Sequence, residues 1–257
     1  WGGLGSLAKP GSEAGPDGAR LAGLYGFSIG LFFAALVALR FSHDLMGILP
    51  AELTGLGPAL VFALVLSLVV SFPLGHYFVL NAVLVGGDVA LVYLLESAGA
   101  AAGGLFVQFI LVPVLSNWQG AAAVGATAAA LALAVMKPGR GRRPLVAALA
   151  LAAGLAAFDL PSQRASWRPL RLVEAVDTPY GKLQVIRNAE QVTLYDNGLA
   201  VFTHPDLGAA EETVHFALLQ PDGVSKVLII GGGAGGGVAE ALEYPDVKVD
   251  YLELDAF

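Results

Sequence analysis

The sequence predicts a bundle of membrane helices followed by a soluble α/β part. Only 14% of the 257 residues are charged, whereas a soluble domain contains about 25%. Residues 1–159 contain 7 basic and 7 acidic residues, and residues 160–257 contain 7 basic and 14 acidic residues, a net charge of −7. Uncharged apolar runs fill the first part, and short β-type segments with a glycine-rich loop fill the second. We therefore expect two domains in two environments.

Composition excludes several kinds of site. The chain has no cysteine, so disulfides, thiolate catalysis and cysteine-based metal sites are excluded. No metal site is expected either, because metal-ligand spacing is missing among the four histidines, His43, His76, His204 and His215. The acidic soluble part argues against nucleic acid as a partner, since phosphate binding needs a basic face.

Residues 1–20 are rich in glycine, proline and alanine, and they are predicted to form a loop or linker. No apolar stretch precedes them, so a signal peptide is not expected. The first residue is Trp1, and the last, Phe257, comes shortly after an expected strand. We therefore expect the sequence to be a portion of a longer protein.

Residues 21–159 are predicted to form a transmembrane bundle of about five helices, because a span needs about 20 mostly apolar residues. The candidates are Leu21–Phe41, Pro58–Phe72 continued by Tyr77–Val85, Val89–Leu115, Gln119–Met136 and the short Pro144–Phe158. A break or kink is expected at Pro73-Leu74-Gly75. Membrane lipid is thus an expected partner, and the expected location is a bacterial cytoplasmic (inner) membrane.

Two features of these helices bear on packing and orientation. Gly26 and Gly30 form a GxxxG pair, and the stretch Ser97–Gly104 is almost entirely small. Such residues let helices approach closely in lipid, so we expect a tightly packed central helix and either further membrane subunits or a homo-oligomer. The basic residues of 137–143 favour a cytoplasmic loop, but the side of the soluble part stays open because basic residues follow the fifth segment too.

Asp88 and Glu96 lie in or beside the predicted spans. An ionisable group in a membrane is costly and often functional. Two explanations remain open: a proton or substrate path of a transporter, or carboxyl groups with a structural role in the bundle.

A small antiparallel β domain is predicted for residues 160–205. Its strand candidates are Leu172–Val176, Leu183–Arg187, Gln191–Tyr195 and Leu199–Thr203. Turns are expected at 188–190 and at 196–198, where Asn197-Gly198 supplies the positive φ values of a tight hairpin.

Residues 206–257 are predicted to contain a strand, a glycine loop, a helix and a second strand. A helix is expected at Glu211–Gln220. The unit itself consists of Lys226–Ile230, an apolar run suited to a strand buried on both faces, then Gly231–Gly237, a helix at Val238–Tyr244 and a strand at Val247–Leu254.

The glycine loop predicts a nucleotide site. Gly231, Gly233 and Gly236 have GxGxxG spacing, and Glu253 follows Gly233 by 20 residues. Glycines allow close backbone approach, a helix N-terminus offers N–H groups, and a carboxylate after the second strand can bind ribose hydroxyls. The expected binding residues are Gly231, Gly232, Gly233, Gly235, Gly236, Glu253 and Asp255. The alternative is a glycine loop that only makes a tight turn.

The order of several motifs resembles the spermidine synthase (aminopropyltransferase) family. These motifs are Thr178–Gly181, Tyr195–Gly198, Glu211 with His215, Val227–Gly236 and Tyr251–Asp255. The upstream part, including Tyr93–Gly104 and Pro113, resembles the membrane region of membrane-fused members. The resemblance implies the start of a Rossmann-like, methyltransferase-type fold and polyamine synthesis by aminopropyl transfer from decarboxylated S-adenosylmethionine to putrescine.

The same resemblance implies roles for single residues. Glu211 and His215 would contact the polyamine substrate, and no tightly bound cofactor is implied. The family's general-base aspartate falls beyond Phe257, so the catalytic residue is unknown and this chain alone, with two parallel strands, is not expected to catalyse the reaction.

Several positions depart from the family pattern. Ala234 stands where the loop usually has aspartate, Ala209 and Ala210 replace Tyr-His, and Ala200 or Val201 replaces a glutamine. A cationic diamine needs acceptors that replace its water, and methyl groups supply none. A non-catalytic accessory subunit of a larger membrane complex therefore remains the alternative to an enzyme.

Overall fold

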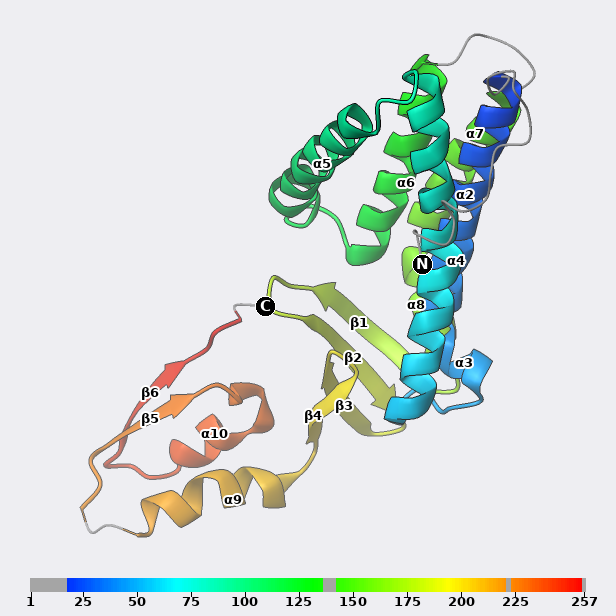
Figure 1. Cartoon of the computed structure of the whole chain (residues 1–257). Helices are drawn as coiled ribbons and strands as arrows, with labels where there is room; N and C mark the ends of the chain where they lie inside the picture. The colour runs from blue at the N-terminus through cyan, green and yellow to red at the C-terminus, as the bar shows by residue number, and fades with distance from the viewer. Residues whose placement is uncertain (1–17, 136–141, 221–222, 256–257) are drawn as a thin grey trace. The chain divides into compact units, whose positions relative to one another are not determined.

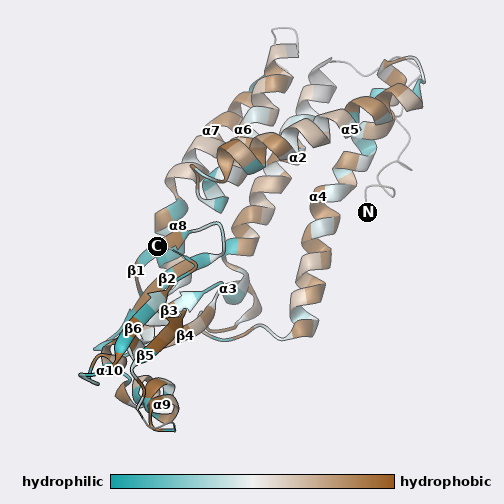
Figure 2. Cartoon of the chain, turned by 90° about the vertical axis from the view of Figure 1, so that its left-hand side faces the viewer, coloured by the Kyte–Doolittle hydropathy of each residue, from teal (hydrophilic) through white to brown (hydrophobic). Residues whose placement is uncertain are grey.

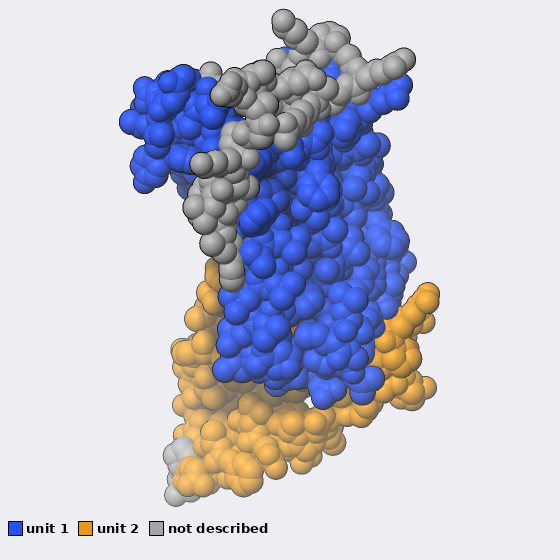
Figure 3. All heavy atoms as spheres, turned by 45° about the vertical axis from the view of Figure 1, so that its right-hand side comes forward, with its two compact units in different colours: residues 1–166 blue, residues 167–257 orange. Residues whose placement is uncertain are grey.

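The computed structural model describes residues 18–135, 142–220 and 223–255 (Figure 1). The chain divides into two compact units, Trp1–Ser166 and Trp167–Phe257, which Figure 3 shows in separate colours. The first unit is helical, and the second contains all the strands found in the described ranges. A helix at Asp159–Ser166, which the sequence did not predict, precedes the sheet.

The helices of the first unit are α2 (Gly18–Arg40), α3 (Ser42–Met46), α4 (Leu56–Leu84), α5 (Val89–Phe106) with the π-helical turn η1 (Val107–Leu111), α6 (Asn117–Val135), α7 (Arg143–Ala157) and α8 (Asp159–Ser166). Three stretches are long and apolar enough to cross a membrane, namely Ala22–Arg40, Leu56–Val83 and Val89–Leu111. The pair α7 and α8, bent by 58°, adds a fourth if it is one span. Figure 2 shows how few hydrophilic residues α4 and α5 carry.

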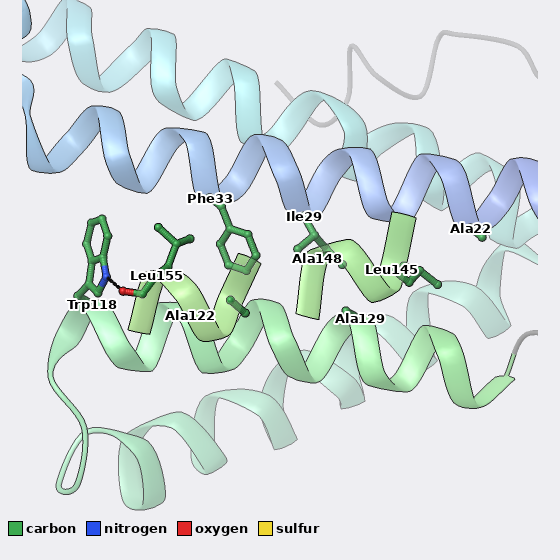
Figure 4. Packing of buried hydrophobic residues seen from close by; sticks show 10 residues of the cluster. Ala22, Ile29, Phe33, Trp118, Ala122, Ala129, Leu145, Ala148 and Leu155 are labelled. Atoms are coloured by element: carbon green, nitrogen blue, oxygen red, sulfur yellow. Dashed lines mark hydrogen bonds between the residues drawn. The ribbon is translucent and has the colours of Figure 1, made fainter. Parts of the chain in front are cut away.

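The core of the first unit lies between α2, α6 and α7 (Figure 4). Phe33 of α2 is 1% exposed and packs over Gly125 of α6. A Cβ at Gly125 would stand 2.5 Å from the Phe33 ring, so only glycine lets the two helices pack this closely. Small residues such as Ala122, Ala129 and Ala148 fill the rest of the seam.

The two glycines of the GxxxG pair in α2 have different surroundings. A Cβ at Gly26 would lie 2.5 Å from Cβ and 3.0 Å from the backbone carbonyl carbon of Pro144, whereas a Cβ at Gly30 would meet no atom within 4 Å. Gly26→Ala should therefore lower the free energy of unfolding by about 1–3 kcal/mol through overpacking. Gly30→Ala, its matched control, should be neutral or stabilising by up to about 1 kcal/mol. Thermal unfolding in detergent measures both, and equal effects would contradict the packing.

Two predictions for the membrane helices are wrong, the first of them in part. Of the break or kink predicted at Pro73-Leu74-Gly75, the break is wrong, since α4 continues from Leu56 through Pro73 to Leu84. A proline removes one backbone hydrogen bond, and the apolar turns on both sides keep the helix formed. The small-residue stretch Ser97–Gly104 does not form a central helix. Its residues are exposed, and neither Gly99 nor Gly103 has an atom within 4 Å of an added Cβ. Small side chains allow close packing but do not specify the partner helix.

The second unit begins with a four-stranded antiparallel meander in the order β1-β2-β3-β4. The strands are β1 (Arg171–Asp177), β2 (Lys182–Asn188), β3 (Gln191–Asp196) and β4 (Leu199–His204), which confirms all four predicted strands within about two residues. Asn197 and Gly198 have φ values of +50° and +82° in the β3–β4 turn, as the Asn-Gly signal predicts. Trp167, Leu172, Ile186 and Tyr195 form its buried cluster.

The rest of the unit contains α9 (Leu207–Leu218), β5 (Lys226–Ile230), the 3₁₀ turn η3 (Gly233–Gly235), α10 (Gly237–Ala241) and β6 (Lys248–Leu252). β5 and β6 pair in parallel. Val227 and Ile229 pack with α9 and α10, but Leu228 and Ile230 on the other face are 59% and 72% exposed. The expected burial of β5 on both faces is therefore wrong for the described residues, because these helices cover one face only.

Candidate functional site

The glycine loop takes a backbone shape that side-chain-bearing residues rarely adopt. Gly231, Gly232 and Gly236 have φ values of +69°, +70° and +91°, a region that glycine enters at no steric cost. The N–H of Gly231 donates to the carbonyl oxygen of Leu252 at 2.8 Å. This bond joins the start of the loop to the end of β6, immediately before Glu253.

Glu253 is connected to the loop through one hydroxyl group. Its carboxylate accepts hydrogen bonds from the Tyr251 hydroxyl and, at 3.0 Å, from the N–H of Leu254. The same hydroxyl oxygen accepts the N–H of Gly233 at 3.3 Å. Gly233, Tyr251 and Glu253 are solvent-accessible, so a carboxylate and a backbone donor face a position that a ligand can reach from water.

The hydrogen bonds shift the titration of this carboxyl. The Tyr251 hydroxyl, and then the Leu254 N–H, hold the pKa of Glu253 below its ordinary value because both donate to the ionised form. The stabilisation that Glu253 gives the folded chain is therefore present above the ordinary glutamate pKa, and it is lost as the pH falls through the lowered pKa.

Tyr251→Phe removes the main donor and should raise the pKa of Glu253 toward its ordinary value. A carbon-detected NMR titration of the Glu253 carboxyl in both proteins measures the change. Tyr244→Phe, which removes a hydroxyl bonded to His215, should leave this titration unchanged. Identical Glu253 curves in the wild type and Tyr251→Phe would contradict the described contact.

The other glycines predicted for the site line the loop's inner side. A Cβ at Gly236 would stand 3.1 Å from Cβ of Ala210, and a Cβ at Gly235 would stand 3.8 Å from Cβ of Phe202. The loop thus packs on α9 and β4. Helix α10 has five residues and is shorter than the predicted Val238–Tyr244, so the polar groups that the described loop offers are its backbone N–H groups and Glu253. Asp255, two residues after Glu253, is half-buried.

The predicted substrate residues lie on α9. Glu211 is exposed, and His215 stands one helical turn later. Nδ1 of His215 is 2.7 Å from the Tyr244 hydroxyl, and its Nε2 is 3.3 Å from a carboxylate oxygen of Glu240. His215 therefore links α9 to α10 and the turn that follows, and a polyamine would compete with these contacts.

The carboxyl groups of the predicted spans have local partners. Asp88 caps α5, since its carboxylate accepts the N–H of Leu91 at 2.9 Å, and N-capping is a common structural role. Glu96 is exposed and lies 3.5 Å from the side-chain amide of Asn81. Neither contact requires a transport path. Within the described ranges, no three histidine or acidic side chains gather as metal ligands would.

Sequence reasoning missed a buried polar cluster in the first unit. The carboxylate of Asp159 accepts bonds from Arg40 at 2.9 Å, from the Gln163 amide at 2.9 Å and from the Ser116 hydroxyl at 2.5 Å. The Arg40 guanidinium also lies 4.3 Å from the ring centre of Trp118. The cluster ties α2, α6 and α8 together, and only the apolar runs around it were visible in the sequence.

Tyr251 was also missed as a site residue. It lies two positions before Glu253, so strand periodicity places both side chains on one side of the chain. That periodicity is the signal in the sequence that could have identified it.

Comparison with known proteins shows sequence similarity to one class of enzyme. The polyamine aminopropyltransferase of Korarchaeum cryptofilum is 40% identical over 86 residues, which is 33% of this chain and 24% of that protein. The chain is similar to polyamine aminopropyltransferases over part of its length. The polyamine aminopropyltransferase of Mycobacterium tuberculosis (strain ATCC 25618 / H37Rv) is 31% identical over 173 residues, covering 61% of this chain and 33% of that protein. Polyamine aminopropyltransferase 2 of Ralstonia nicotianae is 36% identical over 115 residues, 41% of this chain and 22% of that protein.

The matches cover only part of each relative, since the chain spans 22% to 33% of the length of these three proteins. Because residues 167–257 are about a third of the chain, a match over 61% of it also includes residues of the helical unit. No protein-family model and no solved structure matches the chain.

Proposed function

We propose that the second unit forms the adenosyl-binding part of a membrane-bound aminopropyltransferase. The observation that carries this proposal is the short connection from Glu253 through the Tyr251 hydroxyl to the N–H of Gly233. A carboxylate after the second strand and a glycine loop after the first are the groups that bind a ribose and the atoms next to it. The similarity to polyamine aminopropyltransferases supports an adenosyl ligand.

The ligand that fits this chemistry is decarboxylated S-adenosylmethionine. In the proposed reaction, an amine nitrogen of putrescine attacks the aminopropyl carbon bonded to the sulfonium. The new C–N bond forms, the C–S bond breaks with its electrons going to sulfur, and the nitrogen loses a proton to a base. The products are spermidine and 5′-methylthioadenosine. The enzyme mainly aligns the two reactants and accepts the proton.

The amine would approach from the α9 side of the loop. Glu211 is exposed there, and His215 follows one turn later. A polyamine is a cation, and residues 160–257 have a net charge of −7, so their field attracts it. Glu211 and His215 are therefore the proposed substrate contacts, and a resident cofactor is not part of this mechanism.

The helical unit would hold the protein in a bacterial cytoplasmic membrane. The stretches Leu56–Val83 and Val89–Leu111 are long and apolar enough to span it. Large apolar side chains on both are exposed, including Leu60, Val61 and Leu95 at 54%, 63% and 58%. Lipid is the environment that such surfaces match.

An assay of aminopropyl transfer tests the proposal. The full-length protein, purified in mild detergent, would be incubated with putrescine and decarboxylated S-adenosylmethionine carrying labelled carbon in its aminopropyl group. Labelled spermidine and an equal amount of 5′-methylthioadenosine are expected. No labelled product, together with no bound nucleoside, would refute the enzymatic function.

A non-catalytic accessory subunit is the second candidate, and one contact favours it. Ala210 is 5% exposed and packs against Gly236, so the α9 side of the loop presents a methyl group at that point. A scaffold of this kind should co-purify stoichiometrically with other membrane proteins. A free monomer that turns over substrate in detergent would exclude it.

A further inference from the structure

Tyr251 is placed where the two halves of the proposed site meet. Tyr251 lies in β6 and pairs with Ile229 of β5 in the parallel ladder. Along the chain it comes two residues before Glu253, and across the ladder it lies close to the glycine loop that follows β5. A Cβ at Gly233 would overlap the phenol end of Tyr251. The absence of a side chain at Gly233 is therefore what allows the tyrosine to lie on the loop backbone.

The hydrogen bonds of Tyr251 are those that a sugar hydroxyl would make. Its O–H donates to the Glu253 carboxylate, and its oxygen accepts the N–H of Gly233. A ribose hydroxyl is likewise a donor to the acidic residue after the second strand, and a hydroxyl is both donor and acceptor. One phenol group thus uses the two polar groups that the proposed function assigns to the nucleoside.

We propose that Tyr251 occupies the sugar position of the site when no nucleoside is bound, and that an adenosyl ligand must displace it. The proposal rests on the adenosyl-binding function above. The ring is 43% exposed, so it can swing into solvent without opening a core. Only chains in which Tyr251 has moved off the loop bind the ligand. The apparent affinity is therefore lower than the intrinsic affinity, in proportion to the fraction of chains in that open state.

Nucleoside affinity in tyrosine variants tests this inference. The probe is 5′-methylthioadenosine, and its Kd is measured by equilibrium dialysis with the purified protein in detergent. Tyr251→Phe keeps the ring and removes both hydrogen bonds, so the Kd should fall by about 3- to 10-fold. Tyr251→Ala also clears the space over Gly233 and should lower the Kd at least as far. Tyr244→Phe, which loses a bonded hydroxyl elsewhere in the unit, should leave the Kd unchanged.

The results separate this inference from the function on which it rests. Weaker binding in Tyr251→Ala with unchanged binding in Tyr251→Phe would mean that the ring stacks on the ligand. Weaker binding in Tyr251→Phe would mean that the hydroxyl forms a hydrogen bond with the ligand. Either result overturns displacement and leaves the adenosyl site intact. No binding by the wild type or by any variant, with thermal unfolding showing folded protein, would refute the adenosyl-binding function and the inference together.

A second readout needs no ligand. Hydrogen bonding to Glu253 raises the pKa of the Tyr251 phenol, so Glu253→Gln should lower that pKa. An NMR titration of the phenol carbon, assigned by its loss in Tyr251→Phe, measures it. Identical titration in the wild type and Glu253→Gln would show that Tyr251 does not occupy the position, and would overturn the inference.

Discussion

Glu253→Gln is expected to weaken the binding of 5′-methylthioadenosine by about 10- to 100-fold. The carboxylate is the proposed acceptor for the ribose hydroxyls, and a hydrogen bond to a charged group contributes about 1.5–3 kcal/mol. Glutamine keeps the size of the side chain but loses the charge and one acceptor oxygen. Isothermal titration calorimetry of the detergent-solubilised protein gives the Kd.

The control for this variant is Glu243→Gln. Glu243 is an exposed glutamate of the same unit that lies after α10 and before Pro245, so the variant makes the same charge change away from the loop. Its Kd should equal that of the wild type. If both variants weaken binding equally, the effect is one of net charge, and Glu253 has no specific role.

Asp159→Ala is expected to lower the free energy of unfolding of the helical unit by about 3–5 kcal/mol. Its side chain and that of Arg40 are 9% and 13% exposed, and the variant leaves the guanidinium buried without this partner. The hydroxyl of Ser116 and the amide of Gln163 lose the same acceptor. Thermal and denaturant unfolding in detergent measure the loss.

Two further variants separate a buried pair from a general charge effect. Asp44→Ala removes an exposed aspartate in α3 and should change stability by less than about 0.5 kcal/mol. The double variant Arg40→Leu/Asp159→Leu should recover much of the loss, because an unpaired buried charge causes most of it. A double variant as unstable as Asp159→Ala would show that the pair itself, and not the unpaired charge, stabilises the unit.

The sequence correctly predicted turns and strands whose conformation is set by residues adjacent in the chain. Asn197-Gly198 takes positive φ values in the β3–β4 turn because few other pairs do so without strain. The apolar run Lys226–Ile230 forms β5 with the predicted bounds. Its burial could not be predicted in the same way, because burial depends on which helices cover each face. In the described residues one face of β5 is exposed.

Structural features that depend on residues far away in the sequence were predicted less well. Pro73 indicated a break or a kink, and the break is wrong because the helix on both sides maintains α4 through it. Small residues indicated close packing at Gly26 and in the stretch Ser97–Gly104, but an added Cβ would meet a close neighbour, Pro144 of α7, only at Gly26 and not at Gly99 or Gly103. Arg40 and Asp159 are 119 positions apart, and no local pattern indicates that they meet.

At the candidate site the spacing of Gly231, Gly233 and Gly236 and the position of Glu253 indicated a sugar-binding carboxylate near a loop. The structure shows that the loop and Glu253 lie close together, and sugar binding stays a prediction. The contact of Tyr251 with both groups requires the parallel register of β5 and β6, which the sequence does not specify. Glu211 and His215 remain predictions.

A crystal structure of the protein with 5′-methylthioadenosine tests the central claim most directly. We predict ribose hydroxyls within hydrogen-bonding distance of the Glu253 carboxylate, the nucleoside against the backbone of Gly231–Gly236, and the Tyr251 ring moved off Gly233. A nucleoside bound elsewhere, with the Tyr251 hydroxyl still between Glu253 and the N–H of Gly233, would contradict the account.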